Sequence, residues 1–552
     1  MDFKQIETGE INAFWRCAVE FLNQNDLLAL GRTNKYFNEL CSKKLYEKIV
    51  ISRDPVLRSQ EWYLDCGKSY VAGYRSWKKS QDQNDLFLYD RVVRLTGSSQ
   101  LALVKEVVIQ EDVFNNEKEG LVVLEQLVEK LIALDQLEVL DIRDSVLFSR
   151  FYSQYLKLSN LRQCQIWNVA DLEQLQSVEK VKSLKLVLKQ PRFDSLSLSQ
   201  RVKSALSHNL VELAVDDLEH SSLRLFQYFC TEGLILKAVR SLKFNHVHGI
   251  HDYNKTMREI TILFLKDTFL LEKISCLEFE GSCEITECSC FNDFLMDLAP
   301  YLHSLRELGL IERTFITQGD HYTEENWDLS VNKFVLHLPD VSERLKKLSI
   351  RHNPPLNGIT IDSVEGNYVR RRTLYENVLP KLTSLESLIA PTFLRSVAAY
   401  EVLVCDLLWN GCECDFCAKV LAVIDAFIMN HQFYSYPDGG FKDIIPTVFF
   451  AYTGDALERR FVTETDWDLK TSSICPVTHA WDLHGYENIQ HFQDYECHFD
   501  ESAYVALCTC VAHFFNSYMD RLVKYLPSLR WCVLSGIYYA VNDNNEYRSI
   551  YD

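Results

Sequence analysis

Apolar residues recur along much of this chain in a three-position pattern, with two residues between the first pair and one between the second. The second pair alternates with a single residue, which is the period of a short β-strand with one buried face. Helical periodicity fills the intervals between copies, for example over 119–134 and 195–208. The eleven copies are Val104/Val107/Ile109, Leu137/Leu140/Ile142, Leu161/Cys164/Ile166, Val181/Leu184/Leu186, Leu210/Leu213/Val215, Val239/Leu242/Phe244, Ile274/Leu277/Phe279, Leu305/Leu308/Leu310, Leu345/Leu348/Ile350, Leu385/Leu388/Ala390 and Leu529/Cys532/Leu534.

A strand and a helix in each repeat, from about residue 100 to 395, resemble the leucine-rich-repeat family. The resemblance implies a solenoid with a parallel sheet on the concave side and helices on the convex side, each repeat covered by its neighbours. The intervals are irregular, and the asparagine or cysteine that the family places after the strand is mostly missing; Asn353 is in place. We therefore predict an α/β fold with an irregular repeat array, and a generic α/β protein is the alternative.

The first fifty residues show a different pattern, that of three short helices. Apolar residues at helical spacing predict the first helix over 10–22, with Asn25 and Asp26 offering an N-cap for the next. The second helix covers 26–32 and ends or bends at Gly31, and the third covers 34–45 with Tyr36, Phe37 and Leu40 inward. A segment this small cannot bury all its large apolar side chains internally, so another surface must cover the rest.

This segment resembles an F-box over roughly residues 6–51. The family's opening Leu-Pro is replaced here by Ile6-Glu7-Thr8-Gly9. A helical cap on the repeat array is the alternative interpretation. The positions that carry the resemblance are Phe21-Leu22, Asp26-Leu27-Leu28, Asn34-Lys35-Tyr36-Phe37 and Leu45-Tyr46.

An F-box with leucine-rich repeats implies the substrate receptor of an SCF-type ubiquitin ligase. Its N-terminal helices would dock on a Skp-type adaptor, which binds a cullin, and its array would bind a target protein. An irregular array also resembles fungal F-box-like proteins that sequester or inhibit a partner without a ligase, for example a small GTPase of vesicle traffic; a plain repeat scaffold is the third reading. The expected adaptor-binding residues, some of which must instead form the module's own core, are Ile11, Phe14, Trp15, Phe21, Leu22, Leu27, Leu28 and Phe37.

The patterns divide the chain into five parts. An F-box-like module covers 1–51, a connector 52–100 and the array 101–395. The repeat register is then lost over 396–500, which we interpret as a cysteine-containing helical and loop insertion. The terminal helix and the last repeat strand occupy 501–552. Long insertions on a repeat scaffold are common recognition elements.

Three groups of residues could bind a metal. Cys412, Cys414 and Cys417 follow Gly411 closely enough to converge on one tetrahedral zinc ion, with Cys405 or His431 as the fourth ligand. Small buried thiols at a helix start are the alternative. Two further groups are weaker candidates. Cys276, Cys283, Cys288 and Cys290 form the first, but Cys276 lies inside a repeat strand. His246, His248 and His251 form the second, but no thiol or carboxylate is paired with them at a standard spacing, so a solvated repeat loop is the better interpretation of these histidines.

Composition limits the classes of partner. The net charge of −19 disfavours nucleic acid and anionic membranes. No uncharged apolar run reaches the length of a membrane span, and the polar N-terminus does not resemble a signal peptide.

The 18 cysteines then indicate a reducing compartment, the cytoplasm, the nucleus or both. No nucleophile elbow, phosphate loop or dinucleotide glycine pattern is present, so we expect a protein that is not an enzyme.

Overall fold

The computed structural model describes residues 7–52, 67–72, 81–110, 113–114, 118–188, 197–217, 222–248, 262–283, 289–312, 322–351, 372–390, 412–420, 422, 509–510, 512–534 and 537–549. The chain forms two compact units. The first contains 1–185 and 198–210, and the second contains 186–197 and most of the chain from 211 onward.

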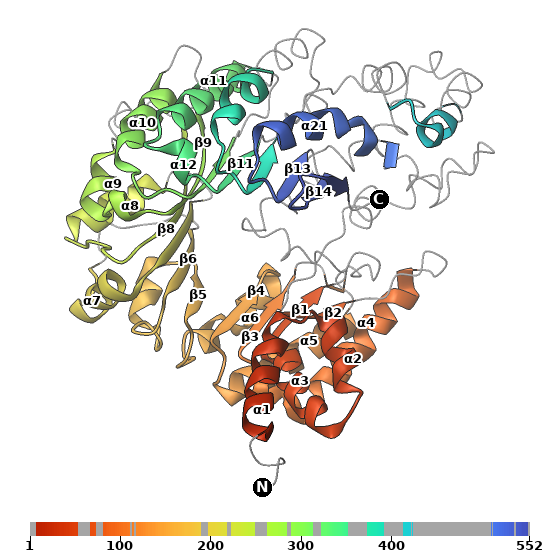
Figure 1. Ribbon diagram of the computed structural model, residues 1–552. Helices are drawn as coiled ribbons and strands as arrows, with labels where there is room; N and C mark the ends of the chain where they lie inside the picture. The colour runs from red at the N-terminus through yellow and green to blue at the C-terminus, as the bar shows by residue number, and fades with distance from the viewer. Residues whose placement is uncertain are drawn as a thin grey trace, which may run out of the picture. The chain divides into compact units, whose positions relative to one another are not determined.

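The N-terminal helices form as expected, with small differences at their ends (Figure 1). The N-cap of the second helix is Asn23, whose side chain accepts a hydrogen bond from the Asp26 amide, rather than Asn25 or Asp26. Asn34 caps the third helix through the Phe37 amide, and the second helix ends at Gly31. The elements are α1 (Glu7–Ala18), η1 (Val19–Phe21), α2 (Gln24–Gly31) and α3 (Lys35–Glu47).

The first strand of this unit's sheet, β1, follows the third helix without a loop. The strands of this sheet are parallel in the order β2-β1-β3-β4-β5, so the strand that continues α3 lies inside the sheet, with β2 at the edge. The strands are β1 (Lys48–Ser52), β2 (Ser69–Ala72), β3 (Glu106–Ile109), β4 (Val139–Ile142) and β5 (Gln163–Ile166). The remaining helices of this unit are α4 (Gln81–Thr96), η3 (Ser99–Leu103), α5 (Lys118–Leu134), α6 (Ser145–Tyr155), η4 (Val169–Glu173) and α7 (Gln200–Asn209).

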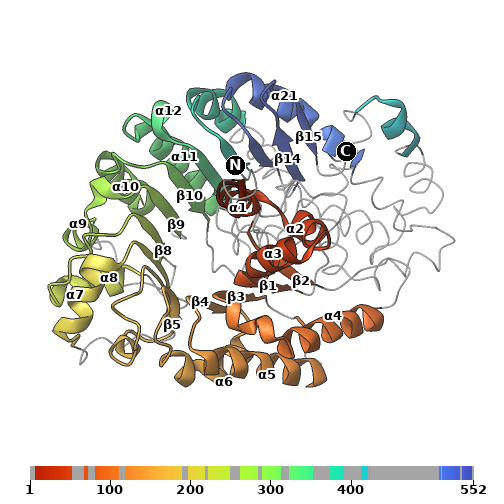
Figure 2. The same ribbon diagram turned by 60° about the horizontal axis from the view of Figure 1, so that its bottom comes forward.

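The next strand, β6 (Ser183–Leu188), contains the boundary between the units. In the second unit, parallel strands follow in chain order from β7 to β13, and α8, α9 and α10 lie outside the strands (Figure 2). Two strands that no repeat predicts, β14 and β15, extend the end of this sheet in antiparallel fashion. The strands are β7 (Glu212–Asp217), β8 (Ser241–His248), β9 (Cys276–Cys283), β10 (Glu307–Ile311), β11 (Lys347–Arg351), β12 (Ser387–Ala390), β13 (Trp531–Leu534), β14 (Ile537–Val541) and β15 (Tyr547–Ser549). The helices are α8 (Leu223–Thr231), α9 (Leu263–Thr268), η6 (Leu271–Lys273), α10 (Cys290–Leu298), η7 (Ala299–Tyr301), α11 (Tyr322–His337), α12 (Val341–Arg344), η8 (Leu374–Val378), η9 (Leu379–Lys381) and α21 (Asn516–Tyr525).

The core follows the repeat pattern. Every residue of the eleven predicted copies is buried, and each copy coincides with one strand from β3 to β13. The middle residues of neighbouring copies pair directly, as Leu348 does with Leu388 and Leu388 with Cys532. The predicted α/β class with parallel repeat strands is therefore confirmed. β12 and β13 are adjacent strands of the sheet, although residues 391–530 separate them in the chain.

Residues 52–100, which the sequence analysis describes only as a connector, contain the strand β2 and the helix α4 among their described residues. β2 pairs with β1 along four residues, and α4 packs beside α5 and β2. The polar residues around this segment's aromatic side chains concealed both elements.

Candidate functional site

The N-terminal module has a small core of its own. Val19, Leu27 and Cys41 are its buried members. Leu27 is only 1% exposed, so it stabilises the module and offers no side chain to a partner. Among the expected adaptor-binding residues, Leu22 also packs against this core, half buried, together with Leu30, Leu40 and Leu45.

The second and third helices are in contact at Gly31, where a Cβ would meet α3 at an ordinary van der Waals distance. A Cβ at Gly31 would lie 3.5 Å from the Cβ of Cys41. The Asn38 side-chain amide donates a hydrogen bond of 3.2 Å to the Gly31 carbonyl, where the helical ladder of α2 has ended. The end of α2 is thus fixed on α3, and this packing orients the residues of α2 that face away from the core.

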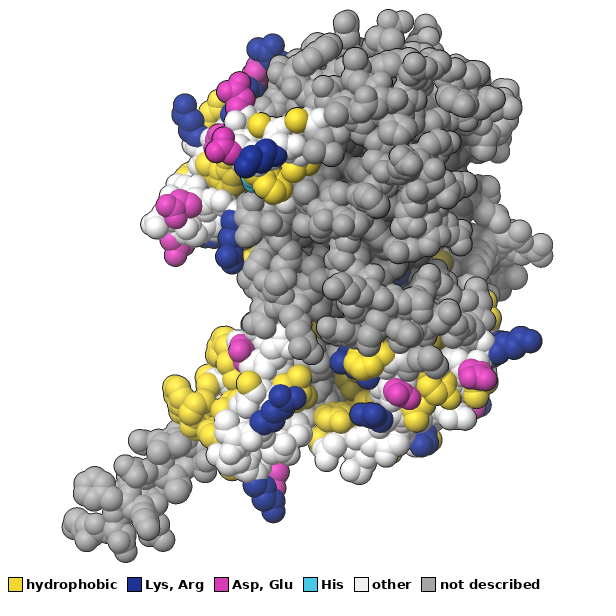
Figure 3. Space-filling view, turned by 90° about the vertical axis from the view of Figure 1, so that its right-hand side faces the viewer, with side chains coloured by type: hydrophobic (Ala, Val, Ile, Leu, Met, Phe, Trp, Pro, Cys, Tyr) yellow, Lys and Arg dark blue, Asp and Glu magenta, His cyan; other side chains and the backbone are white. Residues whose placement is uncertain are grey.

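The surface of the module exposes several large apolar side chains. Phe14 is 63% exposed, Phe21 73% and Leu28 40%. Tyr36, which the sequence pattern placed inward, is also 40% exposed. Figure 3 shows hydrophobic side chains exposed among the described residues at the bottom of the view, where the N-terminal elements lie in Figure 1. Exposed apolar side chains concentrated on so small a module are typical of a protein-binding surface.

Four aromatic side chains of α1 and α3 form a continuous row, which we call the aromatic row: Phe14, Trp15, Phe37 and Tyr36. Ring centroids are 5.4 Å apart for Phe14 and Trp15, 4.8 Å for Trp15 and Phe37, and 5.3 Å for Tyr36 and Phe37, each pair edge to face. Trp15 and Phe37 are half buried, so the inner rings hold the outer two in place. Rigid aromatic side chains of this kind are frequent anchors of protein interfaces.

Two polar connections fix the module to the sheet. The Gln24 side-chain amide donates to the Tyr70 carbonyl at 3.1 Å and accepts from the Tyr70 amide at 2.9 Å. Gln24 thereby binds the backbone of β2 as a neighbouring strand would, and covers part of an edge. At the other end of the module, the Lys105 ammonium group lies 3.0 Å from the Glu47 carboxylate.

Glu47 is also paired with Lys44, whose ammonium group contacts Glu20 as well. Burial alone would raise the pKa of Glu47, but Lys105 and Lys44 outweigh it and hold the pKa below its usual range. Burial alone would lower the pKa of Lys44, but Glu20 and Glu47 raise it. These ion pairs therefore connect η1 and α3 with Lys105, the residue that precedes β3.

The sequence anticipated the module but not how its residues divide. Phe14, Phe21 and Leu28 are on its surface, Trp15 and Phe37 lie in the aromatic row, and Leu27 is in the core. The Ile11 side chain lies outside the described part of the chain. Adaptor binding by these residues stays a prediction.

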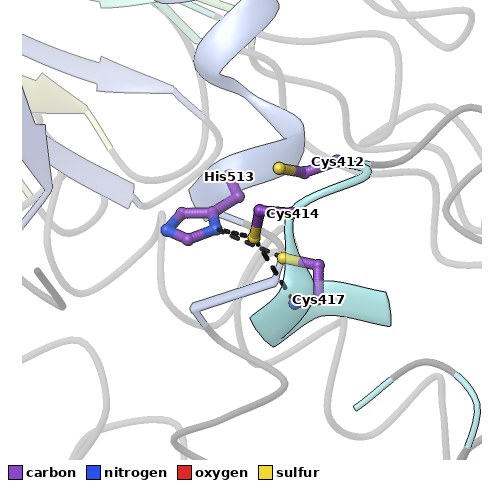
Figure 4. A group of neighbouring side chains, drawn as sticks. All are labelled: Cys412, Cys414, Cys417 and His513. Carbon is purple, nitrogen blue, oxygen red and sulfur yellow. Dashed lines mark hydrogen bonds between the residues drawn. The ribbon is translucent and has the colours of Figure 1, made fainter. Parts of the chain in front are cut away.

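A second site joins the cysteine segment to the helical residues before α21. The ligand atoms of Cys412, Cys414, Cys417 and His513 all lie within 4.8 Å of one another. His513 Nδ1 is 3.6 Å from the Cys414 sulfur and 3.2 Å from that of Cys417 (Figure 4). Cys405 and His431, the two fourth ligands that the sequence suggested, lie outside the described residues.

The thiols of this group differ in environment. The Cys417 amide donates a hydrogen bond to the Cys414 sulfur and lowers the pKa of that exposed thiol to about 6. Burial raises the pKa of Cys417, and it raises the pKa of Cys510, which lies beside Cys417, to about 11.

The other two candidate metal groups do not converge in the part of the chain that the structure describes. Cys276 and Cys283 stand at opposite ends of β9, and Cys288 lies outside the described residues. His246 is buried in β8, with its ring 6.2 Å from that of Phe294, so it is not part of a solvated loop. His248 ends β8, but its side chain and all of His251 are outside the described part.

None of the described helices has the length and apolar character needed to cross a bilayer. No family model matches the chain. Over 540 residues the chain is 47% identical to a Saccharomyces cerevisiae protein named "Non-SCF-type F-box protein ROY1", covering 96% of this chain and 97% of that protein.

This similarity corrects one expectation. We expected a substrate receptor of an SCF ubiquitin ligase, joined to a cullin through its adaptor. The name of the yeast relative describes an F-box protein of the non-SCF type. The prediction of an SCF substrate receptor is therefore wrong. The alternative hypothesis, an F-box-like protein that acts without a ligase, agrees better with the name of this relative.

Proposed function

Because this chain belongs to the F-box proteins, we propose that its N-terminal module binds a Skp-type adaptor and that the chain holds a partner protein without forming an SCF ligase. The observation that carries the adaptor proposal is the surface of the module. Phe14 and Tyr36 at the ends of the aromatic row are exposed, as are Phe21 and Leu28. A folded core behind these residues means that a partner can bind them with little ordering cost.

The Gln24 and Glu47 connections support a rigid attachment of the module to its own sheet. A bound adaptor would then stand in a fixed relation to the first strands of the array. The partner protein would bind the repeat array or the segment inserted between β12 and β13. The resemblance to fungal F-box-like proteins makes a small GTPase of vesicle traffic the first class of partner to test.

The adaptor proposal is tested with purified full-length chain and a purified Skp-type adaptor, by calorimetry or biosensor. We expect Phe14→Ala and Leu28→Ala each to weaken binding of the adaptor by about 1–3 kcal/mol, or about 5- to 150-fold, because both side chains are exposed on the surface that we assign to the interface. Phe87→Ala is the matched control, because Phe87 is an exposed phenylalanine on α4, outside the module. Equal losses for all three variants, or none, would refute the assigned surface.

The partner proposal is tested separately by adding candidate GTPases in each nucleotide state to the adaptor-bound chain. Retention of the GTPase without its modification by ubiquitin supports a holding function. A chain that binds the adaptor but no partner would be a plain scaffold. A chain that binds neither would make the helices only a cap on the array.

A further inference from the structure

Three cysteines and one histidine from distant parts of the sequence converge in the second unit. Cys412, Cys414 and Cys417 lie within one short segment, and His513 is 99 positions beyond Cys414. We propose that these four residues bind one structural zinc ion that joins the segment after β12 to the helical residues before α21. This site involves no residue of the adaptor-binding module.

The distances suit tetrahedral zinc coordination. With zinc–sulfur bonds of about 2.3 Å and zinc–nitrogen bonds of about 2.0–2.1 Å, neighbouring sulfur and nitrogen ligands are about 3.5 Å apart. The distances from His513 Nδ1 to the sulfurs of Cys414 and Cys417 are 3.6 and 3.2 Å, on either side of this value. All four ligand atoms fit within 4.8 Å, so a small adjustment of side chains admits the ion.

The ligand set is closed in the way that structural zinc sites are. Three thiolates and one imidazole complete a tetrahedron and leave no position for water or substrate. The Cys417 amide donates to the Cys414 sulfur at 3.5 Å, which favours the anionic sulfur that a metal requires. Cys417 lies in the first turn of the helix over 415–420, and Cys412 and Cys414 lie in the residues directly before that helix.

His513 is placed by the end of the repeat sheet. The Tyr539 hydroxyl of β14 donates a buried hydrogen bond of 2.7 Å to the carbonyl of Ala512, the residue before His513. Phe515, two residues after His513, is fully buried. One ligand is therefore rigidly attached to the last strands, and the metal would attach the other three to it.

The consequence is a bridge across the long excursion between two adjacent strands. β12 and β13 pair directly, yet 391–530 separate them in the chain. A zinc ion would fix both parts of this excursion to one point beside β14. Because the binding free energy of such an ion is folding free energy, the ion would stabilise this end of the array.

Metal analysis of the full-length chain, purified without chelator, tests the proposal. We expect one zinc per chain, measured by elemental mass spectrometry, and loss of most of it in Cys414→Ser and in His513→Ala. His513→Cys should keep the metal, because it supplies a fourth thiolate. Cys17→Ser and His337→Ala are matched controls and should keep full zinc, since Cys17 is an exposed cysteine of α1 and His337 an exposed histidine of α11.

Replacement of zinc by cobalt gives a readout that does not require the variants to fold. The wild-type chain should show sulfur-to-cobalt charge-transfer absorption and the intense visible bands of a tetrahedral site. Absence of zinc and of these bands in the wild type would overturn the proposal, as would full zinc in the Cys414→Ser/His513→Ala double variant. Loss of zinc in Cys510→Ser with retention in His513→Ala would overturn the assigned ligand set.

Discussion

Alanine substitution should lower the stability of the module at one leucine of α2, Leu27, and leave it almost unchanged at the next, Leu28. Leu27 is buried with Val19 and Cys41, and Leu28 is 40% exposed. Leucine-to-alanine changes in a core cost about 2–5 kcal/mol, depending on how well the site collapses. The surrounding leucines of this module are only partly buried and can relax, so Leu27→Ala should cost about 2–3 kcal/mol. Leu28→Ala, at an exposed position, should change stability by about 0.5 kcal/mol or less.

Hydrogen exchange of peptides from α2 and α3 measures these costs locally. In Leu27→Ala, their protection should fall by about 30- to 150-fold, since 1.4 kcal/mol corresponds to a factor of ten. In Leu28→Ala, protection should change little, while adaptor affinity falls. Peptides covering β9 and β10, in the second unit, report any global effect. Equal loss of protection in the two variants would refute the division between core and surface.

Three further predictions concern the connections and the sheet. Gln24→Ala removes both side-chain bonds to Tyr70 and should lower the local opening free energy of β2 by about 1–3 kcal/mol, seen as faster exchange of that strand. Gly281→Ala should destabilise by about 1–3 kcal/mol and lower Tm, because its Cβ would lie 2.8 Å from the His246 carbonyl oxygen, which belongs to the paired strand β8. The pKa of Glu47 is lower in the folded protein than its unfolded value of about 4.3. The ionised carboxylate therefore stabilises the fold above the unfolded pKa, and this stabilisation is lost as the pH falls through the folded pKa. In Glu47→Gln, hydrogen exchange should show a smaller loss of local stability between those two pH values.

The repeat strands were predictable because their signal is local. One-sided burial repeats within six residues, and each copy shows it without reference to its neighbours. Leu388 and Cys532 illustrate this, since both were identified from their own surroundings and pair directly in the sheet despite the long separation. The helical module was predictable for the same reason, from the spacing of its apolar residues, although its second helix is capped by Asn23 rather than by Asn25 or Asp26.

Features that depend on distant contacts were not predictable. His513 carries no local sign of a metal in the sequence, and its proximity to the three cysteines depends on how its segment packs beside β14. The short edge strand β2 is held partly by the side chain of Gln24, which no periodicity reveals. Helical spacing also could not separate Leu27 from Leu28, or place Tyr36 outward, because the direction of each face is set by how α1, α2 and α3 pack.

We propose that this F-box protein binds a Skp-type adaptor without a cullin. Co-purification of the full-length chain from its native source, with blots for the Skp-type adaptor and the cullin, tests it most directly. A Trp15→Ala/Leu28→Asp variant serves as the control for the module surface. We predict that the wild type retains the adaptor and no cullin, and that the variant retains neither. Cullin recovered with the wild type in proportion to the adaptor would show that the protein assembles into an SCF-type ligase and would contradict the proposal.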